Sequence, residues 1–181
     1  RLQTIEDGRG KRIDVTFRPL TDPSIHTPQP AVLPAKSVQG PMYVVAELNV
    51  SNGVSGTGVT TTRYRYIGAQ KHVRGLGFLG FHDVLMNDTT TGITTRHTYS
   101  QDYAQRLQHR VLATTTSMPN GVVLSNKSTT YVVRESVHVG TDALNYSTFI
   151  PTTPMVQLGS HGELGEWLAT VVTTTLSYDA F

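Results

Sequence analysis

The stretch Gly75-Leu76-Gly77-Phe78-Leu79-Gly80-Phe81 decides between two fold classes. Its glycine spacing satisfies G-x-G-x-x-G, a pattern that binds a dinucleotide when a strand precedes it and a helix follows. The residues after it pass through a turn signal with β-branched residues on both sides, and they show no helical period. The stretch therefore indicates a glycine-bent β-ribbon followed by a hairpin, and it argues against a nucleotide-binding fold.

Two phenylalanines in this stretch require a distortion of the strand. Phe78 and Phe81 lie three positions apart, so a regular strand would place them on opposite faces. A bulge at Gly80 would turn both inward, because glycine adopts the backbone angles that such a bulge needs. The stretch therefore predicts a kinked core strand, with a hinge in the wall of a shell as the functional alternative.

Turn signals divide the rest of the chain into short strand-like segments. In 42–51, Val44, Ala46, Leu48 and Val50 alternate with other residues and are expected to face the core. The expected strands are 2–5, 12–17, 42–51, 59–67, 78–87, 92–101, 107–118, 122–136, 137–149 and 168–178, and one helical turn is considered at 162–168. Serial hairpins of this kind predict an all-β antiparallel meander with more than about 40% strand, against a usual 20–25%.

Composition narrows the class of protein. The 181 residues contain no cysteine, which excludes disulfides and thiolate metal sites. A net charge of +2 is too small to predict nucleic-acid binding, and no apolar run is long enough for a membrane span. Six prolines between 19 and 41 predict an extended surface connection without strands, because proline removes a ladder donor.

Residues that could carry chemistry are few and scattered. The histidines, among them His97, His109 and His138, lack acidic neighbours at ligand spacing, so no metal site is predicted. Glu163 and Glu166 flank a Leu-Gly pair beside a tryptophan and could line a sugar platform, although solvated acids explain them more simply. We predict no catalytic residue and no cofactor, and we expect that the chain is not an enzyme.

The order of motifs around the glycine stretch resembles a known family. A Tyr64-Arg65-Tyr66 strand leads into the stretch, and a turn and a second strand follow. The residues that carry the resemblance are Gly75, Gly77, Phe78, Gly80, Phe81, Asp88, Gly92, Tyr99 and Gln101, and Tyr178 with Asp179 resembles the opening of a YD repeat. The whole resembles the region before the repeats in bacterial Rhs/YD-repeat toxin proteins, especially the TcdB-like B component of insecticidal toxin complexes and its SpvB-like relatives.

Two positions depart from the family pattern. Leu76 stands where the family usually has arginine, which removes any salt bridge that this arginine would make. Ala104 replaces the usual proline after the aromatic Tyr103, so the turn at 104–108 is expected to differ from that of the family.

The resemblance implies a function that composition alone would not. It implies a non-catalytic segment of a secreted protein, part of a curved β-sheet shell or sandwich that encloses a cytotoxic C-terminal polypeptide. The implied partners are the remaining shell, the enclosed toxin and other toxin-complex components. Under this interpretation residues 1–181 are one all-β fragment of a longer protein, with a hairpin at 1–18, a connection at 19–41 and a sheet body at 42–181 that ends at the start of a YD repeat.

Two other functions remain open at this stage. The first is a carbohydrate- or receptor-binding β-sandwich of a secreted protein. The second is a glycoside-active enzyme that uses Glu163 and Glu166.

Overall fold

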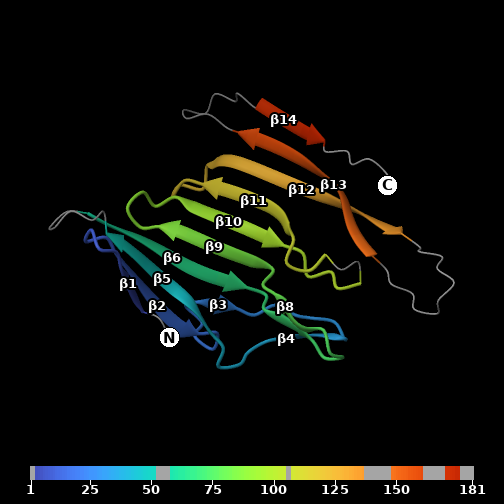
Figure 1. The fold of residues 1–181 in the computed structure, drawn as a ribbon, viewed down its shortest axis with the longest axis horizontal. Helices are drawn as coiled ribbons and strands as arrows, with labels where there is room; N and C mark the ends of the chain where they lie inside the picture. The colour runs from blue at the N-terminus through green and yellow to red at the C-terminus, as the bar shows by residue number, and fades with distance from the viewer. Residues whose placement is uncertain (1–2, 52–57, 105–106, 137–147, 161–169, 176–181) are drawn as a thin grey trace.

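The fold is built from strands (Figure 1). The computed structural model describes residues 3–51, 58–104, 107–136, 148–160 and 170–175, and every regular element in these ranges is a strand. Strand makes up 57%, so the predicted all-β class is confirmed. Within the described ranges no helix is long or apolar enough to cross a membrane.

The strands follow one another with short connections. Their bounds are β1 (Thr4–Glu6), β2 (Arg12–Pro19), β3 (His26–Thr27), β4 (Ala35–Ser37), β5 (Tyr43–Ser51), β6 (Val59–Ile67), β7 (Gln70–His72), β8 (Gly77–Gly80), β9 (Asp83–Asp88), β10 (Thr94–Tyr99), β11 (Val111–Ser117), β12 (Val123–Ser136), β13 (Thr148–Ser160) and β14 (Thr170–Thr175).

These strands form a long sheet and a small one. The long sheet has the order β1-β2-β5-β6-β9-β10-β11-β12-β13-β14, and the small sheet has the order β4-β7-β8. All pairs are antiparallel except β3, which pairs in parallel with β6. In Figure 1 the long sheet runs as one twisted layer from β1 at one edge to β14 at the other, and the small sheet lies beside one end of it. The predicted antiparallel meander is therefore confirmed.

Local turn chemistry located most hairpins correctly. The predicted pair 42–51 and 59–67 is β5 and β6, and the turn at 88–91 joins β9 to β10. The Pro119-Asn120-Gly121 signal lies between β11 and β12, where the Met118 amide donates to the Val122 carbonyl. Residues 107–110, expected in a strand, precede β11 instead.

Beyond residue 136 the expectations and the structure differ. Strand β13 continues to Ser160, whereas the predicted strand ended at 149. Pro151 and Pro154 concealed this strand, because proline usually stops a paired strand. The described part of the predicted strand 168–178 is β14, whereas 137–147 and the helical turn considered at 162–168 lie outside the described residues.

The predicted strand 78–87 is wrong as a single strand. It divides into β8 of the small sheet and β9 of the long sheet, with Phe81 and His82 between them. The reason is Gly80, whose φ of +91° turns the chain out of the extended conformation.

The proline-rich segment 19–41 is also more ordered than predicted. It contains β3 and β4, and it buries side chains that include Leu20, Ile25 and Ala35. The Tyr66 amide donates to the Ile25 carbonyl at 2.8 Å, which fixes the segment to the end of β6. The prolines flank these two short strands and do not interrupt them, so the prediction of a surface connection without strands is wrong here.

The main apolar cluster is small and lies where this segment meets the long sheet. Its buried members are Ile25, Ala46 and Tyr66, with Val44, Tyr64, Phe81 and Val84 packed against them. Of the predicted core face of β5, Ala46 is buried, whereas Leu48 and Val50 are only half-buried. The long sheet is therefore open over most of its described length.

The buried position of Ile25 yields a test of how firmly the proline-rich segment belongs to the core. We expect Ile25→Ala to lower the free energy of unfolding by about 2–5 kcal/mol, because it removes packed methylene groups. Urea unfolding monitored by circular dichroism measures this loss. Val32→Ala, an exposed change in the same segment, is the control and should stay within about 0.5 kcal/mol of the parent. Equal midpoints for the two variants would show that the segment is not part of the core.

Candidate functional site

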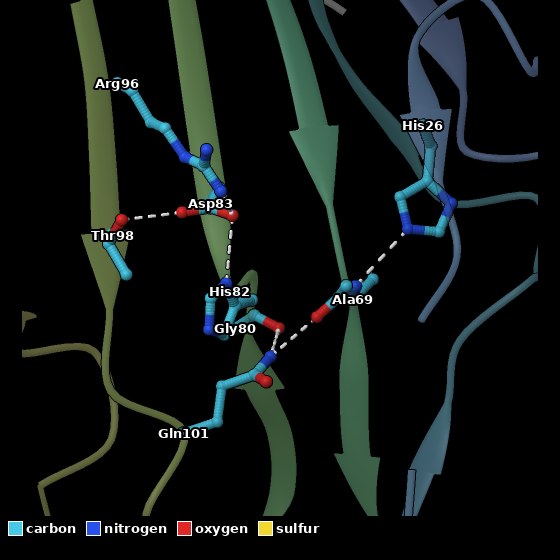
Figure 2. Close-up of polar contacts among 9 residues, drawn as sticks. His26, Ala69, Gly80, His82, Asp83, Arg96, Thr98 and Gln101 are labelled. Carbon is cyan, nitrogen blue, oxygen red and sulfur yellow. Dashed lines mark hydrogen bonds and ion pairs between the residues drawn. The ribbon is translucent and has the colours of Figure 1, made fainter. Parts of the chain in front are cut away.

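The motif residues converge where β8 leaves the small sheet and β9 enters the long sheet. We call this region the sheet junction and define it by Gly68, Gly80, His82, Asp83 and Gln101 (Figure 2). Gly68 follows β6, Gly80 ends β8, His82 precedes β9, and Gln101 lies just beyond β10. The junction therefore brings together three segments of the chain.

Gln101 ties the long and small sheets together through its side-chain amide. Its Nε2 group donates to the Gly68 carbonyl at 2.7 Å and to the Gly80 carbonyl at 2.9 Å. One carbonyl follows a strand of the long sheet and the other ends a strand of the small sheet. Both amide protons are thereby used, so Gln101 acts here as a structural bridge.

Gly80 lets the backbone lie closer to His109 than a residue with a side chain could. A Cβ atom at this position would lie 2.7 Å from Nδ1 of His109, which is closer than Cβ atoms come to such neighbours in proteins. His109 itself has a φ of +67°, which is uncommon for a residue with a side chain. The bulge expected at Gly80 is present, because the register between β7 and β8 shifts between Gln70 and Lys71.

The two phenylalanines lie on either side of this bulge. Their ring centroids are 5.4 Å apart in an edge-to-face arrangement, and Phe81 packs on Tyr66 at 4.6 Å. Phe81 is half-buried and Phe78 remains exposed, whereas Leu79 between them is almost fully buried. The bulge brings the rings together, but the prediction that it turns both inward is wrong for Phe78. Leu79 is the most deeply buried side chain of β8.

Asp83 is the most unusual polar residue of the junction. Its side chain has 0% exposure and accepts hydrogen bonds from three groups. The donors are Arg96 Nη2 at 2.5 Å, Thr98 Oγ1 at 2.7 Å and His82 Nδ1 at 2.9 Å. Because Asp83 pairs with Thr98 across the β9–β10 ladder, the two β10 donors and the carboxylate share one face of the sheet.

This set of donors keeps Asp83 ionised. Burial alone would raise the pKa of Asp83, but the hydrogen bonds from Arg96, Thr98 and His82 outweigh burial and lower the pKa to about 2. The same contact with Asp83 raises the pKa of Arg96. Two of the three donors come from the paired strand β10, so the carboxylate forms a structural ion pair that joins β9 to β10.

A second buried polar group lies in β3, on the side of β6 opposite to β9. His26 is buried, and its Nε2 atom accepts a hydrogen bond from the Ala69 amide at 3.3 Å (Figure 2). Burial lowers the pKa of His26 despite a backbone hydrogen bond at Leu20. The neutral ring therefore joins the proline-rich segment to the start of the small sheet.

Asp88 and Gly92 shape the hairpin between β9 and β10. The Asp88 carboxylate accepts hydrogen bonds from the Thr90 amide at 2.8 Å and the Thr91 hydroxyl at 3.0 Å, which lower its pKa. Gly92 has a φ of +73°, and a Cβ atom there would lie 2.6 Å from Pro119. These two residues fix the turn and the approach of the next hairpin.

The remaining motif residues lie apart from these contacts. The Tyr99 amide donates to the His82 carbonyl at 2.8 Å, so Tyr99 borders the junction. Gly75 and Gly77 have positive φ and lie at the exposed β7–β8 turn, with no atom near a Cβ position. Tyr178 and Asp179 lie outside the described residues.

The long sheet carries an open hollow of about 640 Å³, and its lining includes Ile25, Ala46 and Tyr64 of the main apolar cluster as well as polar residues. Arg18, Arg63 and Arg65 line it, and Glu47 is the one carboxylate among its described lining residues. Glu47 accepts a hydrogen bond from Arg63 Nε at 3.1 Å. Glycoside hydrolysis requires two carboxylates, so the described lining does not supply that arrangement. Glu163 and Glu166 lie outside the described residues.

The described ranges contain no metal-binding cluster. No three histidine, cysteine, aspartate or glutamate side chains there lie close enough to hold a metal ion. His97 instead contacts the Thr114 hydroxyl at 3.0 Å on the neighbouring strand, and His138 lies outside the described residues.

Sequence reasoning missed Asp83, His82, Arg96 and Thr98. A usable signal existed, because the turn at 88–91 sets the register of the hairpin and pairs Asp83 with Thr98. An acid at the start of one strand and an Arg-x-Thr pattern in its partner then fall on the same face.

The family model described as the insecticide toxin TcdB middle/N-terminal region matches residues 2–114, which is more than half of the chain. No curated protein and no solved structure matches the chain. The matched residues contain the whole sheet junction.

The close approach at Gly80 is tested by adding a single methyl group. We expect Gly80→Ala to destabilise the protein by about 1–3 kcal/mol through backbone strain, and by more through the clash with His109. Gly75→Ala is the matched control, because Gly75 has a φ of +102° and no atom within 4 Å of its Cβ position. The difference between the two melting temperatures isolates the clash. Equal melting temperatures for the two variants would show that the close approach does not contribute to stability. The same conclusion would follow if adding His109→Ala to Gly80→Ala did not raise its melting temperature.

The buried carboxylate predicts a specific loss of stability in acid. The folded pKa of Asp83, about 2, lies below its ordinary value of 3.8, so its stabilisation is complete above pH 3.8 and is lost as the pH falls toward 2. Asp83→Asn should therefore lower the urea midpoint at pH 6 and show a shallower further decline between pH 4 and pH 2 than the parent. Glu6→Gln, which removes an exposed carboxylate, should leave the parent's decline unchanged. A parallel decline in the parent and Asp83→Asn would contradict the assignment.

Proposed function

The chain belongs to the family of the insecticide toxin TcdB middle/N-terminal region, and we propose that it is a non-catalytic structural segment of a toxin-complex protein. In this proposal the long sheet is part of a β-shell that encloses a cytotoxic C-terminal polypeptide. The protein is exported with its complex, and its partners are the remaining shell, the enclosed polypeptide and other toxin-complex components.

The observation that carries this proposal is the use made of the motif side chains. Gln101 donates both protons of its side-chain amide to backbone carbonyls. The Asp83 carboxylate accepts hydrogen bonds from donors in its own hairpin. An active site leaves polar groups available to a substrate, whereas these groups join one strand to the next. They therefore support a role in holding a sheet in a defined shape.

The two faces of the long sheet also support a wall. Cross-strand register places Glu47, Arg63 and Asn87 in one row on a polar face. The alternating residues place Ala46, Tyr64 and their apolar neighbours on the other face. Over β5, β6 and β9 the sheet therefore has one polar and one more apolar face, as a wall between solvent and an interior would have. Beyond β9 the register continues the apolar face with Thr95, His97 and Thr114.

Protection of the downstream polypeptide tests the proposal. In the full-length protein we expect the C-terminal polypeptide to resist an added protease for much longer than the same polypeptide expressed alone. Gly80→Ala should shorten this protection by weakening the junction, whereas Gly75→Ala should shorten it less. Equal digestion of the C-terminal polypeptide in the native protein and in isolation would overturn the shell and favour the carbohydrate- or receptor-binding alternative.

A further inference from the structure

One end of the small sheet carries a group of exposed aliphatic side chains. We call this group the apolar tip and define it by Val32, Leu33, Val73 and Leu76, whose exposures are 85%, 76%, 50% and 54%. Val32 and Leu33 precede β4, whereas Val73 and Leu76 lie in the β7–β8 turn. The Val73 amide donates to the Pro34 carbonyl at 2.9 Å, so the two loops lie side by side. Gathered exposed apolar residues mark interaction sites more often than scattered ones do.

Cations surround the apolar tip without acidic partners. Lys36 and Lys71 are directly opposite each other in the β4–β7 register, an arrangement that destabilises a sheet unless an anion offsets it. Arg74 lies in the adjoining turn, and no ion pair within the described residues involves any of these three cations. The segments 23–42 and 68–82, which build the small sheet and its loops, contain no aspartate or glutamate.

The lysines lie on an open face of the small sheet. His72, adjacent to Lys71, points to the opposite face, where its ring packs on Tyr103 at a centroid distance of 4.6 Å. Lys36 and Lys71 are both exposed. The contact with the neighbouring loop therefore leaves the cationic face accessible.

From this arrangement we propose that the apolar tip binds the surface of an anionic lipid bilayer. The aliphatic side chains enter the boundary between headgroups and acyl chains, and the cations contact lipid phosphates. Lys71 lies two residues behind Val73, a separation of about 7 Å along a strand. Apolar groups that bind at a bilayer interface insert to a depth of roughly 5–10 Å, while the accompanying basic residues remain at the headgroups. The separation of Lys71 and Val73 matches this depth.

The binding is weak and sensitive to salt. Each cation near an anionic leaflet strengthens binding by about fivefold, so three give roughly a hundredfold. The contribution of these cations falls as the salt concentration rises, because the screening length is about 10 Å at 0.1 M salt and becomes shorter at higher concentrations. Attachment of this kind is reversible and is independent of whether the long sheet encloses another polypeptide.

Vesicle sedimentation with the 181-residue chain tests the proposal. We expect binding to vesicles of phosphatidylcholine with phosphatidylserine, and little binding to vesicles of phosphatidylcholine alone. Lys36→Gln with Lys71→Gln should weaken binding by about 25-fold. Leu33→Ser with Leu76→Ser should weaken it by about tenfold or more, through loss of inserted apolar surface.

Two control variants distinguish binding by the apolar tip from nonspecific effects of net charge and exposed apolar surface. Arg9→Gln with Lys11→Gln removes the same charge at the β1–β2 turn, which lies at the other end of the sheet from the small sheet (Figure 1). Val59→Ser with Val122→Ser removes exposed aliphatic groups elsewhere. Both controls should bind as the parent does, and circular dichroism melts should show that all four variants are folded. Failure of the parent to bind the anionic vesicles, or equal losses in tip and control variants, would overturn the proposal.

Discussion

A carboxylate without exposed surface can remain ionised only where donors surround it, and the sheet junction depends on this constraint at Asp83. Two of its donors, Arg96 and Thr98, come from the paired strand β10. A slip of one residue between β9 and β10 would carry both donors to the opposite face and leave the charge unpaired. The carboxylate therefore stabilises the register that the turn at 88–91 sets for this hairpin.

The other contacts of the junction follow from that fixed point. Because the His82 carbonyl accepts from the Tyr99 amide and Asp83 pairs with Thr98, the chain must turn sharply between Gly80 and His82 to reach the small sheet. The turn brings backbone carbonyls at Gly68 and Gly80 within reach of the single side chain of Gln101. Glycine is required at Gly80 because His109 occupies the space that a Cβ atom would need. Charge, backbone shape and one amide together orient the small sheet, and with it the apolar tip.

Local signals predicted the parts of the fold that local chemistry determines. The turns at 88–91 and 119–121, and the distortion at Gly80, could be read from neighbouring residues because each turn is closed within a few positions. The Asp83 cluster needs one further step, since its members come together only when the register set by the turn at 88–91 is followed along the hairpin. The contact of His26 with Ala69 spans 43 positions and involves a segment whose prolines predicted an isolated connection.

The small size of the main apolar cluster explains why contacts of this kind matter for the whole sheet. Its buried members are only Ile25, Ala46 and Tyr66, so core volume contributes little to the order of the more distant described strands. Hydrogen-bonded register and paired polar groups must then specify how each hairpin lies on the preceding one. Because the long sheet follows chain order almost throughout, an error at one hairpin passes to every strand beyond it. The sheet junction fixes one such register midway along this strand order, at β9 and β10, and it lies within the matched residues 2–114.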